Sequence, residues 1–152
     1  MRHAKSGDLP GGPDVERALS PRGLRDAAAA GHWLRDRGFV PDLVLCSTAR
    51  RARQTWRQVA AELQAAVTVH EDPRLYQADS AELLDVIGEA PPDVATLMYV
   101  GHNPAAQDLA TGLAGWAQGF RTAAVAVIGL TVPWASAAVG DGELVEFWTP
   151  GS

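Results

Sequence analysis

The sequence of 152 residues predicts an α/β protein with three layers, in which a mixed, mostly parallel sheet carries helices on both faces. Up to Gly115, short apolar runs of strand length alternate with segments that have helical periodicity. The apolar runs are continuous, as expected of parallel strands buried on both faces. The length fits a single domain over residues 1–152.

The first predicted helix follows a long loop. The chain opens on Met1-Arg2-His3-Ala4-Lys5-Ser6, and glycine and proline mark residues 7–19 as loop. Ser20 and Pro21 are typical of a helix start, and Gly38 is typical of a helix end. The inward stripe of this helix is expected to consist of Leu24, Ala27, Ala28, Gly31 and Leu34.

The first recognisable strand is the apolar run 43–46, after which Ser47-Thr48 leads into a helix that begins near Ala49. This order of strand, loop and helix presents backbone N–H groups to an anion. Three arginines at the helix start reinforce that tendency, and they are Arg50, Arg51 and Arg53. We therefore expect an anion site here.

Two further strands are predicted before the C-terminal third. Residues 67–70 form the first of them, and a short helix capped by Ser80 follows. The second covers residues 95–100 and runs directly into Gly101-His102-Asn103-Pro104, where Asn103 and Pro104 are typical of another helix start. His102 is thus expected at the carboxyl edge of the sheet, where open parallel sheets bind ligands.

The last third of the chain is predicted to be β. Residues 123–132 are apolar and rich in β-branched side chains. A hairpin is expected from residues 137–139, a turn at 140–142 and a strand at 144–148.

Charge and composition exclude several classes of protein. The net charge of −5 argues against general binding of nucleic acid. Residues 1–60 carry a balance of +5, and residues 61–152 carry −10. No run approaches the ~20 apolar residues of a membrane span. Cys46 is the only cysteine, so no internal disulfide can form and a cytoplasmic location is expected. Within its apolar run, Cys46 is expected to be a small buried hydrophobe.

Two imidazoles and two guanidiniums stand out in the loops at the predicted sheet edge, and they belong to Arg2, His3, Arg51 and His102. Such a set suits a phosphoryl group. The arginines would bind the non-bridging oxygens, one histidine would attack phosphorus and the other would stabilise the transferring group. A zinc site is less suitable, because neither histidine has a third ligand at metal spacing and the arginines would repel the ion. No metal or other cofactor is expected.

The pattern is similar to the histidine phosphatase superfamily, which has the phosphoglycerate mutase-like fold. The resemblance lies in Arg2-His3, in Arg51 within residues 47–55 and in Gly101-His102, in that order along the chain. Arg2-His3-Ala4-Lys5-Ser6, residues 14–23, Leu75-Tyr76 and Gly101-His102-Asn103-Pro104 resemble the compact SixA-type branch of phosphohistidine phosphatases.

The resemblance implies a metal-independent phosphatase that hydrolyses phosphohistidine in a protein through a covalent intermediate on His3. A small phosphomonoester or phosphoanhydride is the alternative substrate. A catalytically weak phosphate-binding module is the alternative from another class. The sequence lacks the long insertions that cover the mutase sites, so an open site and a phosphorylated protein partner are favoured, with a monomer as the expected state.

The sequence departs from the family pattern in two places. The family has an apolar strand before Arg-His, whereas only Met1 precedes Arg2 here, so this central strand is expected to be truncated or missing. The position after His102 is Asn103, so the His-Asp arrangement of the acid phosphatases is absent. Glu82 is the candidate acid by its place in the chain, although a role in capping its own helix is equally expected.

Overall fold

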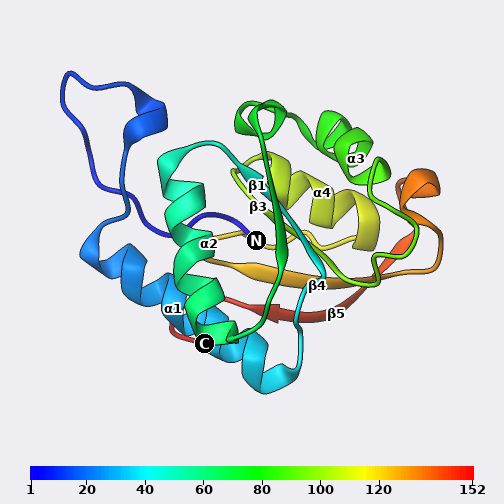
Figure 1. Cartoon of the computed structure of the whole chain (residues 1–152). Coiled ribbons are helices and arrows are strands. Elements are labelled where there is room, and N and C mark those ends of the chain that lie inside the picture. The colour runs from blue at the N-terminus through cyan, green and yellow to red at the C-terminus, as the bar shows by residue number, and fades with distance from the viewer.

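The computed structural model describes all residues, 1–152, as strands lying between two layers of helices (Figure 1). The helices are α1 (Pro21–Arg37), α2 (Arg50–Leu63), α3 (Ser80–Gly88) and α4 (Ala105–Ala114). The strands are β1 (Leu43–Ser47), β2 (Thr68–Asp72), β3 (Leu97–Val100), β4 (Val125–Leu130) and β5 (Gly142–Trp148). Three short 3₁₀ helices complete the chain, η1 (Asp14–Glu16), η2 (Pro73–Tyr76) and η3 (Trp134–Ser136).

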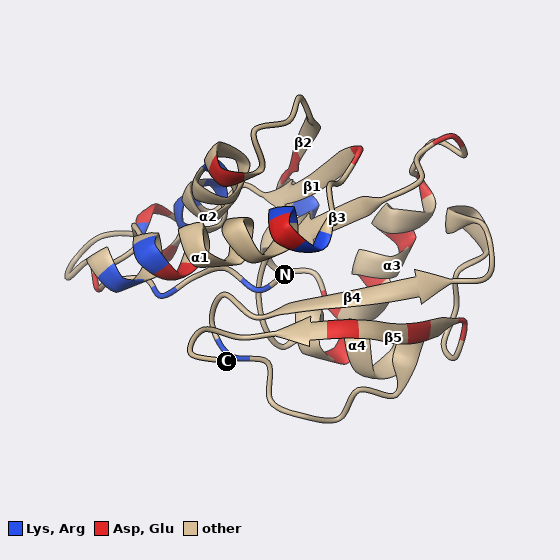
Figure 2. Cartoon of the chain, turned by 90° about the horizontal axis from the view of Figure 1, so that it is seen from below, with Lys and Arg blue, Asp and Glu red and all other residues tan.

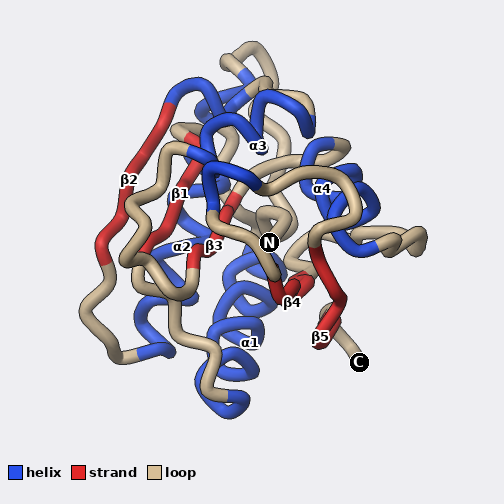
Figure 3. The backbone as a smooth tube through the Cα atoms, turned by 90° about the vertical axis from the view of Figure 1, so that its right-hand side faces the viewer, coloured by secondary structure: helices blue, strands red, loops and turns tan.

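The strands form a parallel sheet in the order β2-β1-β3 and an antiparallel pair, β4-β5. Along β1, Val44 and Cys46 pack into a core with α1 and α2, and Leu45 between them packs into a second core with α3 and α4. Figure 3 shows these two pairs of helices on opposite sides of the strands. Burial on both faces explains the continuous apolar runs of β1 and β3, whereas β2 at the edge of the sheet is largely exposed. The α/β prediction is confirmed.

Residues 1–3 lie between the two groups of strands and join them. The Met1 amine donates to the carbonyl of Tyr99 at 2.8 Å, and His3 N–H donates to the carbonyl of Gly101 at 2.8 Å. On the other side, Arg2 N–H donates to the carbonyl of Ala124 at 3.1 Å. The only strand-type bridge of this segment joins Arg2 and Gly101. The Arg2-His3 segment is nevertheless held on both sides.

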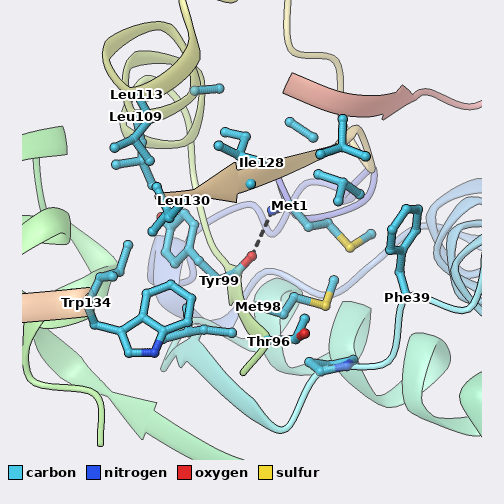
Figure 4. A pocket seen from close by; sticks show the side chains of 18 of the residues that line it. Met1, Phe39, Thr96, Met98, Tyr99, Leu109, Leu113, Ile128, Leu130 and Trp134 are labelled. Atoms are coloured by element: carbon cyan, nitrogen blue, oxygen red, sulfur yellow. Dashed lines mark hydrogen bonds between the residues drawn. The ribbon is translucent and has the colours of Figure 1, made fainter. Parts of the chain in front are cut away.

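An apolar cavity of about 600 Å³ continues from Met1 between β3 and β4 (Figure 4). Side chains of both strands line it, including Met98 and Ile128, and Trp134 closes one side. None of His3, Arg51 and His102 lines this cavity. The chemistry suggested by the sequence therefore lies outside it.

The boundaries of α1 agree with prediction, but its inward face does not. Ser20 accepts a hydrogen bond from Gly23 N–H at 3.1 Å, and Gly38 ends the helix with φ of 75°. Leu24 was expected in the core but is 37% exposed, and Gly23 is buried in its place. The reason is a close backbone crossing, because a Cβ on Gly23 would meet the carbonyl oxygen of Lys5 at 2.0 Å.

Three local predictions were wrong. β5 pairs with β4 and not with residues 137–139. Residues 137–139 follow η3, in which the indole N–H of Trp134 donates to the carbonyl of Val94 at 2.8 Å. Asp79, not Ser80, caps α3. Asn103 does not cap α4, because its amide donates to the carbonyl of Phe120 at 3.0 Å.

Charge is distributed unevenly over the fold. Figure 2 shows most Lys and Arg around α1 and α2, and acidic residues on α3, α4 and β5. The imbalance between the two parts of the sequence thus becomes an imbalance between two sides of the molecule. None of the four helices combines the length and the hydropathy needed to cross a bilayer.

Candidate active site

The structure gathers the two predicted imidazoles and Arg51 at the carboxyl edge of the parallel strands. His3 follows the segment paired with β3, Arg51 is the second residue of α2, and His102 comes two residues after β3. The ring centroids of His3 and His102 are 5.2 Å apart. Arg51 Nε donates to His3 Nε2 at 3.3 Å. The sheet edge thereby places groups that are 48 and 99 positions apart in the sequence within one small volume.

His3 is held as a neutral imidazole whose Nε2 carries a lone pair that faces Arg51. Its Nδ1 lies 2.7 Å from the carbonyl oxygen of Ala4. A carbonyl oxygen only accepts, so Nδ1 carries the hydrogen and Nε2 carries the lone pair. Burial of the ring, with smaller effects of His102 and the arginines, lowers the pKa of His3 to about 3. His3 is therefore uncharged at neutral pH and keeps the lone pair on Nε2 that a nucleophile needs.

His102 is fixed by β1. Its Nε2 lies 2.8 Å from the hydroxyl oxygen of Ser47, the last residue of that strand, and its backbone N–H donates to the Tyr99 hydroxyl at 3.0 Å. Burial, and then the positive charge of Arg51, lower the pKa of His102 to about 4. A neutral imidazole offers one N–H donor, which is suitable for a phosphoryl oxygen and adds no full charge.

Arg2 has a buried donor that no protein group accepts from. Its Nη1 donates to the carbonyl of Phe120 at 3.0 Å, which holds the guanidinium in place. Its Nε is buried and has no partner. A buried N–H without an acceptor is costly, so an anionic ligand at this position would relieve that cost. Burial also lowers the pKa of Arg2 from its usual value.

Arg51 belongs to a network that ties α2 to the loop carrying His3. Its side chain is buried, and its carbonyl oxygen accepts from the Thr55 hydroxyl at 2.7 Å. The same hydroxyl accepts from Ala4 N–H at 3.0 Å. One buried threonine thus positions both the nucleophile and its arginine.

Asp14 and Tyr76 join the site without having been predicted. Asp14 lies on η1 in the loop 7–19, and its carboxylate accepts from Arg51 Nη2 at 3.0 Å and from the Tyr76 hydroxyl. The backbone carbonyl of Asp14 accepts from Arg51 Nη1 at 2.9 Å. The ring of Tyr76 lies 5.7 Å from that of His102. Both residues come from irregular segments, where periodicity carries no signal.

Glu82 does not join this hydrogen-bonded cluster. It lies in the first turn of α3, where its backbone N–H donates to the Asp79 carboxylate at 2.8 Å. Its side chain is exposed and lines a shallow depression together with Arg74 and Asp85. The structure shows no contact of Glu82 with His3, Arg51 or His102 that would support the predicted acid role.

The site is cationic and offers no set of metal ligands. No cluster of three or more His, Cys, Asp or Glu side chains is arranged to hold an ion. The guanidiniums of Arg2 and Arg51 supply positive charge beside a neutral imidazole. This combination can bind a phosphoryl group and attack it.

Comparison with known proteins agrees with this chemistry. Residues 1–84 match the model of the histidine phosphatase superfamily (branch 1). An uncharacterized protein of Mycobacterium tuberculosis is 37% identical over 161 aligned residues, with 99% of each chain covered.

Among solved structures, a candidate phosphohistidine phosphatase SixA from Nakamurella multipartitia superposes with a TM-score of 0.86 at 32% identity, over 100% of this chain and 94% of that one. The protein histidine phosphatase SixA in complex with tungstate gives a TM-score of 0.79 at 26% identity, over 99% of this chain and 94% of that one. The chain belongs to the histidine phosphatase superfamily, in its SixA-type branch, and is a phosphatase.

Proposed function

We propose that this phosphatase hydrolyses phosphohistidine in a protein substrate through a covalent intermediate on Nε2 of His3. The observation that carries the proposal is the state of that ring. The Ala4 carbonyl fixes the proton on Nδ1, and burial keeps the imidazole neutral. Nε2 therefore presents a lone pair next to the Arg51 guanidinium, which is 3.3 Å away.

In the first step, Nε2 of His3 attacks phosphorus and forms a P–N bond. The bond between phosphorus and the imidazole nitrogen of the substrate breaks, and its electron pair stays on that nitrogen. Arg2, Arg51 and the N–H of His102 bind the equatorial oxygens and offset the charge that develops on them. Removal of one such group is expected to lower the rate by about 10²–10³-fold.

In the second step, water attacks the phosphoryl group on His3. The new P–O bond replaces the P–Nε2 bond, whose electron pair returns to His3, and one proton of the water is lost to solvent. Inorganic phosphate leaves, and the imidazole is again neutral. Both steps use residues of the chain for charge stabilisation, so we propose that the reaction needs no metal ion.

The protein substrate is supported by the names of the similar structures and by the chemistry of the leaving group. An imidazole that is protonated on its other nitrogen leaves as a neutral molecule and needs no separate acid. An alkyl ester leaves as an alkoxide and needs one. Glu82 remains the candidate acid for alkyl phosphate esters, and a Glu82→Gln variant should then lower hydrolysis of an alkyl phosphate while hydrolysis of phosphohistidine and of p-nitrophenyl phosphate stays unchanged.

The test uses the whole chain with two substrates, a chemically phosphorylated histidine-containing protein carrying ³²P and, separately, p-nitrophenyl phosphate, both with chelator present. Rapid quenching should trap a labelled enzyme whose label is lost in acid and survives alkali. His3→Ala should abolish both label and turnover. His32→Ala is the matched control, because this exposed histidine contacts Arg35, Asp36 and Glu62, none of which belongs to the site.

The possible results separate the alternatives. Wild-type turnover in the His3→Ala variant would disprove the assignment of the nucleophile. Turnover of p-nitrophenyl phosphate but not of the phosphoprotein would favour small phosphate esters. Binding of phosphate without turnover of either substrate would indicate a phosphate-binding module.

A further inference from the structure

Asp14 places a carboxylate at a cationic phosphate site. Arg51 directs its Nε at His3 Nε2, at 3.3 Å, and its Nη2 at the Asp14 carboxylate, at 3.0 Å. The same guanidinium therefore bridges the nucleophile and the carboxylate. Its side chain is 50% exposed, so it faces the solvent from which a substrate arrives. For a phosphate-binding site this is an unexpected charge, because it opposes the approach of an anion.

The carboxylate is ionised at neutral pH. Hydrogen bonds from Tyr76 and Arg17, the latter at 3.1 Å, hold the pKa of Asp14 well below its usual range. It therefore cannot serve as a proton donor at neutral pH. What remains is its negative charge, which attracts a cation and repels an anionic leaving group.

Tyr76 provides a flat surface beside this charge. Its hydroxyl donates to the Asp14 carboxylate, and its half-buried ring lies 5.7 Å from His102 and 6.0 Å from the Arg51 guanidinium carbon. An aromatic face next to a carboxylate is suitable for a planar cation, which can stack on the ring and donate to the oxygen.

We propose that Asp14 and Tyr76 form the subsite for the leaving group and select a phosphorylated imidazole in its protonated form. The substrate ring stacks on Tyr76, and the N–H on the nitrogen that does not bear phosphorus donates to Asp14. This inference rests on the proposed function, since it assigns the group that distinguishes N–P from O–P substrates. Asp14 then touches the substrate directly.

The competing explanation is that Asp14 only orients Arg51. The two explanations predict different values of the selectivity ratio, which is kcat/KM for phosphohistidine divided by kcat/KM for p-nitrophenyl phosphate. If Asp14 recognises the leaving group, Asp14→Asn lowers kcat/KM for phosphohistidine at least tenfold, while the value for p-nitrophenyl phosphate stays equal or rises. If Asp14 only orients Arg51, both values fall by the same factor, and the proposal is overturned.

The experiment measures both substrates with wild type, Asp14→Asn, Tyr76→Leu and Asp8→Asn. Asp8 lies exposed in the same loop and has no hydrogen bond or ion pair, so its variant is the matched control and should keep the wild-type ratio. Tyr76→Leu should also lower the ratio, because it removes the stacking surface. Melting temperatures of all variants separate loss of selectivity from loss of fold. A wild type that hydrolyses neither substrate would refute the proposed function, whereas an unchanged ratio in Asp14→Asn would refute only the role of Asp14.

Discussion

Thr55 is the buried residue whose replacement should separate stability from catalysis. Its hydroxyl accepts from Ala4 N–H and donates to the carbonyl of Arg51. Valine has nearly the same shape but neither bond. In Thr55→Val the N–H of Ala4, a fully buried residue, loses its acceptor, whereas the Arg51 carbonyl keeps its place in α2.

The loss of stability expected in Thr55→Val follows from the one unsatisfied donor, Ala4 N–H. A buried N–H without an acceptor costs about 1–3 kcal/mol. For a chain of this size, each kcal/mol lowers Tm by about 2–4 °C. Ala4 also provides the carbonyl that fixes the proton of His3, so a loosened Ala4 displaces the nucleophile. A displacement of about 1 Å can lower kcat/KM by roughly 10²-fold.

Thr55→Ser is the informative counterpart. It keeps the hydroxyl and removes a methyl group, which costs about 1 kcal/mol in a packed core. Thermal melts should therefore show similar losses for the two variants, while kcat/KM falls only in Thr55→Val. Thr68→Val, exposed on β2 and without a side-chain hydrogen bond, controls for the substitution itself. Equal activity in Thr55→Val and Thr55→Ser would refute the reasoning, because the hydroxyl would then not position His3.

Two further outcomes are expected. The pKa of His3 is about 3 in the folded state and near 6.5 when unfolded, so the unfolded chain binds more protons between these values. The free energy of unfolding, measured by urea titration, should therefore fall as pH drops from 6.5 toward 3, by up to about 1.4 kcal/mol per pH unit, and less steeply in His3→Asn. An equal slope in His3→Asn would contradict this view. Gly23→Ala should lower the free energy of unfolding by about 1–3 kcal/mol in urea titrations, because its Cβ would meet the Lys5 carbonyl oxygen at 2.0 Å. Gly7→Ala is the control, because a Cβ there would meet no atom within 4 Å. Equal urea midpoints for the two variants would show that the backbone near Gly23 moves to make room.

The position of the site could be predicted because two of its groups directly follow buried strands. Arg51 and His102 each come a few residues after an apolar run, and parallel strands bring their carboxyl ends to one edge. Arg2-His3 lacked that support, since only Met1 precedes it. Its residue types placed it with Arg51 and His102, and only the resemblance placed it beside the sheet; the structure supplies the physical reason in the hydrogen bonds of residues 1–3 to Tyr99, Gly101 and Ala124.

The residues that surround the nucleophile could not be predicted from local pattern. Asp14 reaches Arg51 only because the loop 7–19 folds across the start of α2, and Tyr76 reaches it from η2, which follows β2. Such contacts depend on how loops and short 3₁₀ helices fold in space, which the residue pattern does not reveal. Leu24 was misplaced for a related reason, since the inward face of α1 is decided by the crossing of Lys5 over Gly23.

The backbone hydrogen bonds of residues 1–3 couple amide hydrogen exchange at the sheet to the assembly of the active site. Gly101 N–H donates to the Met1 carbonyl and Ala123 N–H to the His3 carbonyl, so these amides exchange with solvent only when the opening segment detaches. Detachment would also remove the nucleophile from Arg51. Amide hydrogen exchange at Gly101 and Ala123 therefore reports the fraction of time that the enzyme lacks an assembled site, and a bound oxyanion should slow it.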